Sequence, residues 1–266
     1  MSTPASVSSP SVLQVDSLCK SFGGVDAVDK VSFFVRQGEL LALIGPNGAG
    51  KTTCFNMLNG QLKPDSGTVI LNGENITALH PRQVWRRGVG RTFQITATYS
   101  SMTVSENVQM ALISKHRKGL SLFSSASKLY CDEALALLEL VGMQSQAQRS
   151  AGILAYGDLK RLELAIALAH EPVLLLMDEP TAGMAPGERA ELMELTAEIV
   201  VERGLSVLFT EHDMDVVFGH SDRIMVLNRG QLIAQGDADS IRNNEQVQDV
   251  YLGGGSMFAT GAANHA

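Results

Sequence analysis

The sequence has few cysteines, no excess of basic residues and no long apolar run. Its three cysteines, Cys19, Cys54 and Cys131, are odd in number and share no metal-like spacing, which suits a reducing cytosol. No apolar run approaches the roughly 18–20 residues that are needed to span a bilayer. The net charge of -7 disfavours a general nucleic-acid surface, so we expect no nucleic-acid partner.

The chain is long enough to bury a full core. With 266 residues and 45% hydrophobic content, it suits one large domain or one domain with an inserted lobe. Residues 1–11 are rich in Ser and Pro and lack the basic start and apolar core of a secretion signal, so we expect a disordered tail there. We expect a second flexible tail at residues 254–266.

A glycine-rich loop separates an apolar run from a predicted helix. The run, residues 40–44, is typical of a buried strand, and we expect helix from Thr52 onward. The loop fits the pattern Gly, any four residues, Gly-Lys-Ser/Thr, with Gly45, Pro46, Asn47, Gly48, Ala49, Gly50, Lys51, Thr52 and Thr53. In the order strand, loop, helix, this pattern predicts a phosphate site, and an ordinary glycine turn is the alternative.

The residue types in this loop suit a bound triphosphate. Glycines have no Cβ, so the backbone can fold tightly and direct its N–H groups at an anion. The helix that follows adds its unpaired N–H groups and the positive end of its dipole. We expect Lys51 to reach the β- and γ-phosphates and the Thr52 hydroxyl to ligate Mg²⁺, so ATP and Mg²⁺ are the predicted cofactors.

Cys54 follows the loop in the first turn of the predicted helix. The simpler interpretation is a small side chain packed under the loop. The alternative hypothesis is that the helix N-terminus favours the thiolate and makes Cys54 a site of inhibitory alkylation.

The predicted secondary structure changes in type twice along the chain. Residues 12–76 are rich in predicted strands, and the region 95–170 is mainly helical. The last part returns to alternating strands and helices, with Pro186 at a helix start and Gly204 at its end. We expect the polar, serine-rich stretch 115–127 to be a mobile surface insertion, with a basic contact patch as the alternative.

An acidic pair follows another apolar run. Asp178 and Glu179 come directly after residues 173–177, which are typical of a buried strand. Ligands of open parallel sheets bind at the carboxyl ends of the strands, the edge where the phosphate loop also lies. We therefore expect Asp178 to hold the Mg²⁺ shell and Glu179 to polarise a water in line with the γ-phosphate. Helix capping or a solvated turn is the alternative.

In their order along the chain, these motifs resemble the ATP-hydrolysing subunit of an ABC transporter. The resemblance extends from about Val12 to Gly253. It implies that Phe22 stacks on adenine and that His212 contacts the γ-phosphate. It also implies that Gln94 links Mg²⁺ and the attacking water to the membrane partner.

The resemblance implies a single ABC ATPase domain over residues 12–253. The expected fold class is α/β: a P-loop NTPase core with a mixed, mainly parallel sheet, flanking helices and an N-terminal antiparallel β region. An α-helical subdomain, residues 95–170, is inserted between the two parts of the catalytic core, residues 12–94 and 171–253.

The family signature departs from its usual form in this chain. It corresponds to Leu154, Ala155, Tyr156, Gly157 and Asp158, where relatives usually have Leu-Ser-Gly-Gly-Gln and contact the nucleotide of the other subunit. Ala155 cannot supply the usual hydroxyl, so Gly157 and the N–H groups that open the next helix remain as donors. Asp158 is a good cap and a poor phosphate neighbour unless it points away. Ala185 replaces the usual acidic residue of the dimer-contact loop.

The altered signature, the serine-rich insertion and the ending at residues 250–253 together resemble one subgroup. These are ATPases of bacterial importers for branched-chain amino acids and related solutes, including amides, urea and aromatic acids. The resemblance implies a homodimer, or a heterodimer with a paralogous ATPase, and two transmembrane permeases. An external solute-binding protein is an indirect partner, and the subunit is expected to be peripheral on the cytoplasmic face of the inner membrane.

Three other classes stay open at this point. An ATPase of lipopolysaccharide export would share the core. A Leu-Ser-Gly-Gly signature and the absence of the insertion would have favoured that class, and this chain has neither feature. A soluble ABC protein of translation or DNA repair would show tandem ATPase domains or a long coiled coil. A P-loop kinase would lack the signature and His212.

Overall fold

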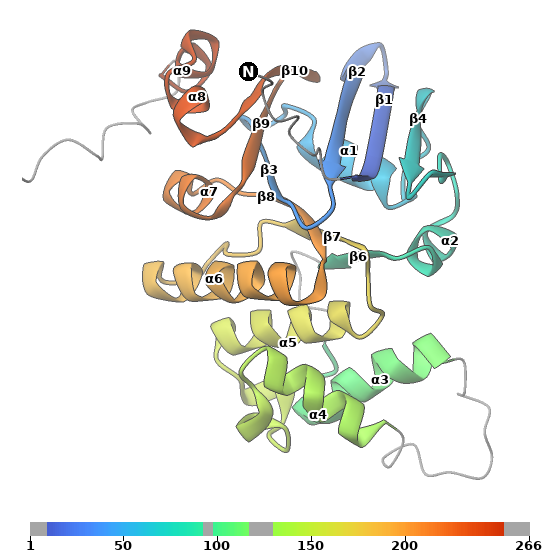
Figure 1. Ribbon diagram of the computed structural model, residues 1–266, viewed down its shortest axis with the longest axis vertical. Helices are drawn as coiled ribbons and strands as arrows, with labels where there is room; N and C mark the ends of the chain where they lie inside the picture. The colour runs from blue at the N-terminus through green and yellow to red at the C-terminus, as the bar shows by residue number, and fades with distance from the viewer. Residues whose placement is uncertain (1–9, 93–97, 117–129, 253–266) are drawn as a thin grey trace, which may run out of the picture.

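The computed structural model describes residues 10–92, 98–116 and 130–252. Figure 1 shows two sheets with their covering helices at one end of the molecule and a group of helices at the other. Among the described residues, no helix combines the length and the apolar character that crossing a bilayer requires.

A six-stranded sheet forms the centre of the fold. Its strands lie in the order β10-β9-β3-β8-β7-β6, and all neighbouring pairs are parallel except β9 with β10. The bounds are β3 Leu40–Ile44, β6 Val89–Thr92, β7 Leu174–Asp178, β8 Ser206–Thr210, β9 Arg223–Asn228 and β10 Gln231–Gly236. Because the strands are parallel, their carboxyl ends meet at one edge, where β3 runs into the glycine-rich loop and β7 ends at the acidic pair.

A smaller antiparallel sheet precedes and flanks the central one. Its strand order is β2-β1-β4-β5, with β1 Ser11–Phe22, β2 Val25–Arg36, β4 Ser66–Leu71 and β5 Glu74–Asn75. The strands β1 and β2 extend further than the apolar runs indicated, to a tight turn at Gly23 and Gly24. Ser11, which we assigned to the tail, is the first residue of β1 and lies opposite Arg36.

Alternate residues of the central strands face two separate apolar clusters. In β3, Leu41 and Leu43 belong to the cluster under the antiparallel sheet and α1, whereas Leu40, Ala42 and Ile44 face the other side. The helices that cover the sheet are α1 Lys51–Leu58, α2 Pro81–Arg86, α6 Pro186–Arg203, α7 Met214–His220, α8 Ala238–Arg242 and α9 Glu245–Leu252. The buried apolar runs therefore follow from a parallel sheet that is covered on both faces.

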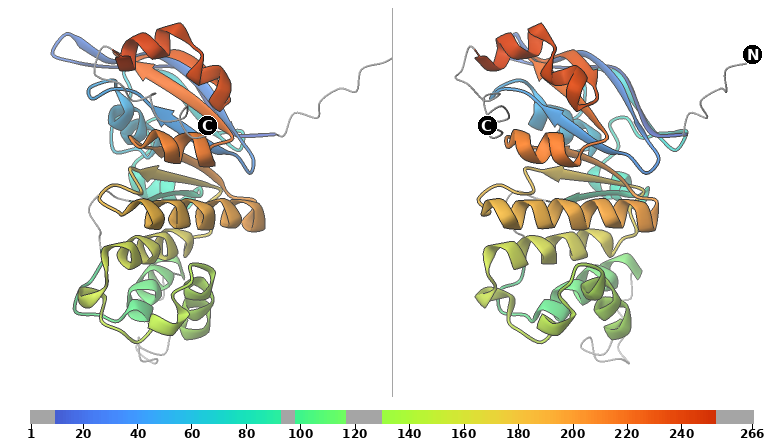
Figure 2. Two further views of the ribbon diagram at one scale, coloured as in Figure 1. Left: turned by 90° about the vertical axis from the view of Figure 1, so that its left-hand side faces the viewer. Right: turned by 60° about the vertical axis from the view of Figure 1, so that its left-hand side comes forward.

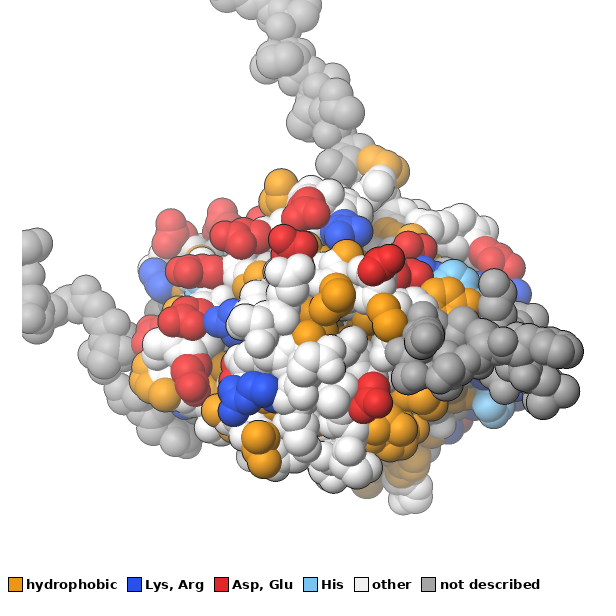
Figure 3. All heavy atoms as spheres, turned by 90° about the horizontal axis from the view of Figure 1, so that it is seen from below, with side chains coloured by type: hydrophobic (Ala, Val, Ile, Leu, Met, Phe, Trp, Pro, Cys, Tyr) orange, Lys and Arg blue, Asp and Glu red, His pale blue; other side chains and the backbone are white. Residues whose placement is uncertain are grey.

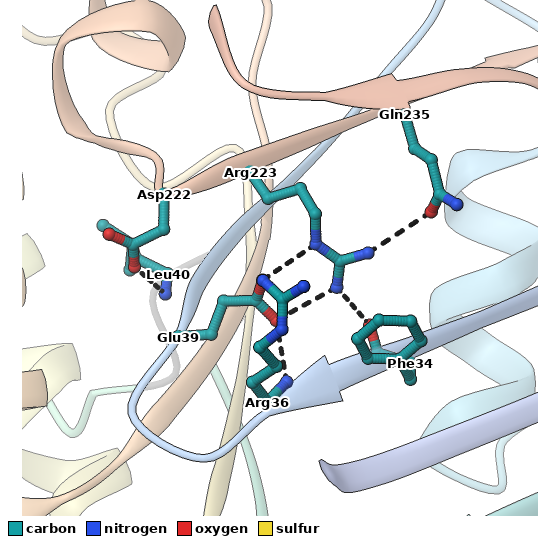
Figure 4. A network of polar contacts seen from close by, with 7 residues as sticks. All are labelled: Phe34, Arg36, Glu39, Leu40, Asp222, Arg223 and Gln235. Carbon is teal, nitrogen blue, oxygen red and sulfur yellow. Dashed lines mark hydrogen bonds and ion pairs between the residues drawn. The ribbon is translucent and has the colours of Figure 1, made fainter. Parts of the chain in front are cut away.

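A buried ion pair joins the two sheets at the amino ends of the parallel strands (Figure 4). Arg223, the first residue of β9, places Nε 2.8 Å and Nη2 3.0 Å from the two carboxylate oxygens of Glu39. Its guanidinium carbon also lies 4.4 Å from the ring centroid of Phe34 in β2. This network is at the opposite end of the strands from the glycine-rich loop, so it orients the sheets and leaves the carboxyl-end edge free for chemistry.

Three α-helices lie between β6 and β7 in the part of the chain that the structure describes. They are α3 Val104–His116, α4 Cys131–Leu140 and α5 Tyr156–Leu168, with short 3-10 turns at Gln144–Gln146 and Ala151–Ile153. They lie together at one end of the molecule, and α5 packs beside α6 of the core (Figure 2). In Figure 3, which looks onto this end, acidic side chains gather along one edge, and no continuous basic patch crosses the part of the face that the structure describes.

The predicted fold class is confirmed: an α/β core with a mainly parallel sheet, an N-terminal antiparallel region and helices between β6 and β7. Helix α6 begins at Pro186 and ends before Gly204, as predicted, and Gly204 has a φ of 61°. The pattern after the signature predicts a helix over residues 159–169, and this boundary is wrong, because α5 begins at Tyr156 and ends at Leu168. Lys115 and His116, which we assigned to the insertion, close α3, and most of that insertion lies outside the described residues.

Candidate functional site

The glycine-rich loop leaves β3 at Gly45 and enters α1 at Lys51. Gly50 has a φ of 105°, and a Cβ there would lie 2.2 Å from the carbonyl oxygen of Ala27, so only glycine fits. The Lys51 side chain folds back over the loop, and its Nζ donates to the carbonyl oxygens of Gly45 at 2.6 Å and Pro46 at 3.3 Å. The loop therefore wraps a single ammonium group, which suits the binding of a multiply charged anion.

Lys51 is buried and lies in the field of the acidic pair. Burial lowers the pKa of Lys51, and the charges of Glu179 and Asp178 oppose that effect. Thr52, one residue along α1, is exposed, and the first turn of α1 has N–H groups without intrahelical partners. An ammonium, free N–H groups, a hydroxyl and two nearby carboxylates form the donor set that a triphosphate with a hard divalent cation requires.

Asp178 ends β7 with both carboxylate oxygens engaged. Its Oδ1 accepts a hydrogen bond of 2.8 Å from Thr210 in β8, and its Oδ2 lies 3.0 Å from Nη2 of Arg91 in β6. These contacts connect three neighbouring strands at their carboxyl ends. Sequence reasoning identified Asp178 and missed Arg91 and Thr210, because neither belongs to a recognised pattern.

Glu179 and His212 meet, although 33 positions of sequence separate them. His212 Nε2 lies 2.8 Å from Glu179 Oε1. Glu179 has a φ of 49°, in the left-handed region that a residue with a Cβ enters only when its surroundings hold it there. Its backbone N–H donates to the carbonyl oxygen of Thr210 at 3.1 Å, and this bond helps to hold the strained turn. The structure thus brings together the two residues that we predicted near the γ-phosphate.

Two further contacts join the loop after Glu179 to the segment around His212. Glu211 is buried, and its Oε1 accepts from the Thr181 hydroxyl at 2.6 Å and from the Thr181 backbone N–H at 2.8 Å. Beyond them, Arg189 in the first turns of α6 pairs with Asp213, the N-cap residue of α7. The two segments are therefore connected at successive positions. Sequence reasoning missed Glu211, since a buried carboxylate has no signal of its own in a sequence.

The altered signature opens α5 close to α6. Ala155 is the N-cap residue, with extended backbone and no side-chain cap, so Asp158 lies in the first turn rather than at the cap. The Tyr156 ring packs on Gly183, where a Cβ would lie 3.4 Å from it. A Cβ on Gly157 would meet the Glu188 carboxylate at 3.4 Å. Among the described residues, no hydrogen bond links the signature to the phosphate loop of the same chain.

Two more residues bear on the nucleotide site. Phe22, at the end of β1, is half exposed, and Lys20 Nζ lies 5.5 Å from its ring centroid, so one face is open to a stacking partner. Tyr251 in α9 is buried and hydrogen-bonds with the Gly45 backbone, a contact between the chain's last helix and the phosphate loop that we did not predict. Gln94 lies outside the described residues.

The thiolate hypothesis for Cys54 is wrong, and the packing interpretation is confirmed. Cys54 has no exposed surface and belongs to the cluster beneath α1. Burial in this apolar cluster raises the pKa of the thiol to about 12.

A cleft of about 600 Å³ opens beside this site. Residues of α2, α3 and α5 line it, together with Arg91 and Gln61. Trp85, on α2, and His170 both line the cleft and contact each other, with ring centroids 3.8 Å apart. The cleft therefore lies at the junction of the core and the inserted helices, directly beside the group that holds Asp178.

The family profile described as "ABC transporter" matches residues 28–182. The chain belongs to the ABC transporter family. A second profile, "Branched-chain amino acid ATP-binding cassette transporter", matches residues 231–256. As an ATP-binding cassette of this family, the chain is an ATPase that works in transport. The alternative of a P-loop kinase is therefore excluded.

Curated relatives match over nearly their whole length. The chain is 43% identical over 249 residues to the high-affinity branched-chain amino acid transport ATP-binding protein LivG of Salmonella typhimurium, covering 91% of this chain and 98% of that protein. It is 40% identical over 252 residues to BraF of Pseudomonas aeruginosa, described in the same words, with the same coverage.

Solved structures match the fold. The ADP conformation of MJ1267, an ATP-binding cassette of an ABC transporter, superposes with a TM-score of 0.82 at 31% identity, covering 92% of this chain and 100% of that one. The dimeric structure of MJ0796, a bacterial ABC transporter cassette, superposes with a TM-score of 0.71 at 25% identity, covering 85% and 98%. Both similarities agree with the predicted P-loop NTPase core.

Proposed function

We propose that this cassette hydrolyses ATP to drive a bacterial importer of branched-chain amino acids or related small solutes such as amides, urea and aromatic acids. The observation that carries the proposal is the match of residues 231–256 to the branched-chain amino acid profile, together with relatives named for that transport. The matched segment contains Tyr251, which connects the subgroup's C-terminal helix to the phosphate loop.

The residues of the site divide the chemistry among them. The loop from Gly45 to Thr53 and Lys51 hold the phosphates, and Phe22 stacks on adenine. Thr52 and Asp178, with Gln94, would hold Mg²⁺, which supplies charge neutralisation at the β- and γ-phosphates. Their oxygen donors fit that hard cation.

Glu179 acts as the base in this proposal. Its carboxylate accepts a hydrogen bond from the attacking water and directs the water's lone pair toward the γ-phosphorus. The 2.8 Å contact between Glu179 and His212 supports these roles, because a base and a γ-phosphate ligand must lie close together. The strained φ of Glu179 is consistent with a side chain held for a task.

A second ATPase subunit completes the site. The signature from Leu154 to Asp158 lies apart from the phosphate loop of its own chain, so it serves a nucleotide bound on the partner. Ala155 supplies no hydroxyl, and the backbone N–H groups at the start of α5 donate in its place. The partner is an identical subunit or a paralogous ATPase.

The cleft beside Arg91 is the surface on which we place a permease. It is concave, and Trp85 and Met110 are among the aromatic and apolar residues that line it. Two permeases, one on each subunit, would hold the dimer peripherally at the cytoplasmic face of the inner membrane, with a solute-binding protein outside.

Co-purification from solubilised membranes tests the transport assignment. Tagged protein is expected to bring down two permeases, and the reconstituted complex with its solute-binding protein is expected to accumulate labelled leucine or a related solute at the cost of ATP. Recovery of ribosomes or DNA without permeases would overturn the assignment, and uptake of an unrelated solute would overturn the solute class.

Glu179→Gln tests the base directly. Removing the base is expected to lower kcat by roughly 10²–10⁴-fold. ATP binding stays intact, so the variant accumulates as an ATP-bound dimer, which size-exclusion chromatography with radiolabelled ATP measures. Lys51→Ala is expected to lose ATP binding instead. Glu202→Gln, an exposed carboxylate at the end of α6, is the matched control and keeps full turnover. Normal hydrolysis by Glu179→Gln would show that another group is the base.

A further inference from the structure

We propose that Arg91 is a positioning residue that couples the cleft to the metal-holding carboxylate Asp178. While the Arg91 guanidinium is paired with the Asp178 carboxylate, it competes with the divalent cation for that carboxylate. When the guanidinium is drawn toward the cleft, the carboxylate becomes available to the cation. This inference rests on the proposed function, because it assigns to cleft occupancy a direct effect on the ATPase site.

Arg91 bridges three parts of the core. Its Nη1 donates to Asn56 in α1 at 2.8 Å and to Gln61, which follows α1, at 3.1 Å. Its Nη2 lies 3.0 Å from Asp178 Oδ2. The side chains of Arg91 and Asp178 are only 11% and 13% exposed, so solvent screens this pair much less than a surface pair.

Arg91 is also one of the residues that line the cleft. Arg91 and Gln61 both line it, and Gln61 is exposed, so a group that enters the cleft can reach this hydrogen-bond network. Arg91 contacts the neutral amide oxygens of Asn56 and Gln61 and the carboxylate of Asp178. An acceptor group from a docked permease segment would compete with Asp178 for the positive charge.

The electrostatics give the sign of the coupling. The Arg91 guanidinium, paired with Asp178 Oδ2, neutralises part of the carboxylate charge that attracts a divalent cation. It also repels that cation directly. Occupation of the cleft by an acceptor therefore raises the metal affinity of Asp178. By linkage, metal bound at Asp178 equally favours the occupied cleft.

The metal affinity of the isolated subunit tests whether Arg91 competes with the divalent cation for Asp178. Mn²⁺ serves as the probe, titrated by electron paramagnetic resonance in the presence of saturating ADP. Arg91→Gln is expected to tighten Mn²⁺ binding by about fivefold or more, because it removes the competing charge. Arg91→Lys keeps a cation and is expected to stay closer to the wild type. Arg82→Gln, an exposed arginine of α2, is the matched control for lost positive charge and is expected to change nothing. Unchanged or weaker Mn²⁺ binding by Arg91→Gln overturns the proposal.

A variant that leaves Arg91 in place tests the direction of its movement. Gln61→Glu gives the guanidinium a charged partner on the cleft side at an exposed position, so folding is unaffected. It is expected to tighten Mn²⁺ binding several-fold in the wild-type background and to have little effect in Arg91→Gln. An equal effect in both backgrounds would mean that the new carboxylate acts on the metal by itself, and the coupling through Arg91 would be refuted.

The assembled transporter tests whether occupation of the cleft by a permease acts on the ATPase site through Arg91. Permease association is expected to stimulate the ATPase of the wild type, with a smaller ratio of stimulated to basal kcat in Arg91→Gln and an unchanged ratio in Arg82→Gln. Unchanged stimulation in Arg91→Gln refutes the coupling while permease binding stands. Absence of any permease association refutes the proposed function, and the Mn²⁺ measurements on the isolated subunit distinguish the two failures.

Discussion

At residue 155 the signature carries a methyl group where the family usually has a hydroxyl. The N-cap position of Ala155 leaves the N–H groups at the start of α5 available to an anion, so the missing hydroxyl removes one donor of several.

Ala155→Ser is expected to change kcat by no more than about threefold, since one neutral hydrogen bond contributes about 1 kcal/mol or less. Steady-state phosphate release by the dimer measures it. A steep rise in ATPase activity would mean that the methyl group, rather than the backbone, limits this site.

Cys54 shows how burial decides the chemistry of a residue that lies beside an anion site. The first turn of a helix favours a thiolate only where the sulfur meets the N–H groups, and Cys54 points into the apolar cluster instead.

Native protein at pH 8 is expected to react with iodoacetamide at Cys19, which is partly exposed, and not at Cys54, with or without ATP. Peptide mass spectrometry gives the labelled fractions, and unfolded protein serves as the reactive control. The folded pKa of Cys54, about 12, lies above the ordinary thiol value of 9.0. Its contribution to stability is therefore present below pH 9 and is lost as pH rises toward 12. Alkylation of Cys54 in the native state at pH 8 would contradict this assignment.

At the scale of elements, the loop between β7 and α6 and the turn between β8 and α7 are connected as one unit. Thr181 with Glu211 and Arg189 with Asp213 provide the connections on either side of the contact between Glu179 and His212. A base on a strained turn needs such support, since a small misplacement of a reacting group costs much of the rate.

Thr181→Val removes one hydroxyl from this unit. It is expected to lower the free energy of unfolding by about 1.5–3 kcal/mol, because the hydroxyl donates to a buried charge, and to lower kcat with little change in nucleotide affinity. Thr196→Val in α6 is the matched control: its hydroxyl is equally buried and donates to the Leu192 carbonyl oxygen at 2.7 Å, far along the helix. Urea unfolding and single-turnover kinetics measure the two effects. Equal losses of kcat in both variants would reduce the role of Thr181 to stability alone.

At the scale of the whole molecule, the inserted helices meet the core at a junction that contains a titratable ring. His170 follows α5 and packs against Trp85, the single tryptophan of the chain. Burial lowers the pKa of His170 to about 4, and the positive charges of Lys115 and His116 contribute. The folded state therefore favours the neutral ring.

Acid is expected to weaken this junction. Because the folded pKa of His170 lies below the unfolded value of 6.5, its contribution to stability is present above pH 6.5 and is lost as pH falls through about 4. His170→Phe keeps a ring against Trp85 and is expected to flatten the pH dependence of unfolding between pH 6.5 and 4, followed by tryptophan fluorescence. His220→Gln, at the end of α7, is the control and keeps the wild-type slope. A slope unchanged by His170→Phe would assign the acid sensitivity to other groups.

Local patterns were enough to predict most elements and several site residues. The loop from Gly45 to Thr53 and the apolar strands have signals within a few neighbouring residues, so their structure could be predicted from short windows. Boundaries were less accurate: α5 begins at Tyr156 because Ala155 takes an extended conformation, which the helical pattern alone does not reveal. Arg91, Glu211 and Tyr251 could not be predicted, since each acts through a residue far away in the sequence.

The sequence by itself determined which chemical groups the protein has and in what order: a phosphate loop, an acidic pair, a variant signature and a histidine after a strand, enough to indicate the family. The tertiary structure decided which groups meet. Arg91 contacts Asp178 although 87 positions of sequence separate them, and Glu179 contacts His212 although 33 positions separate them. Such pairings depend on the order and register of β6, β7 and β8, and sheet order is a property of the folded chain that no local pattern contains.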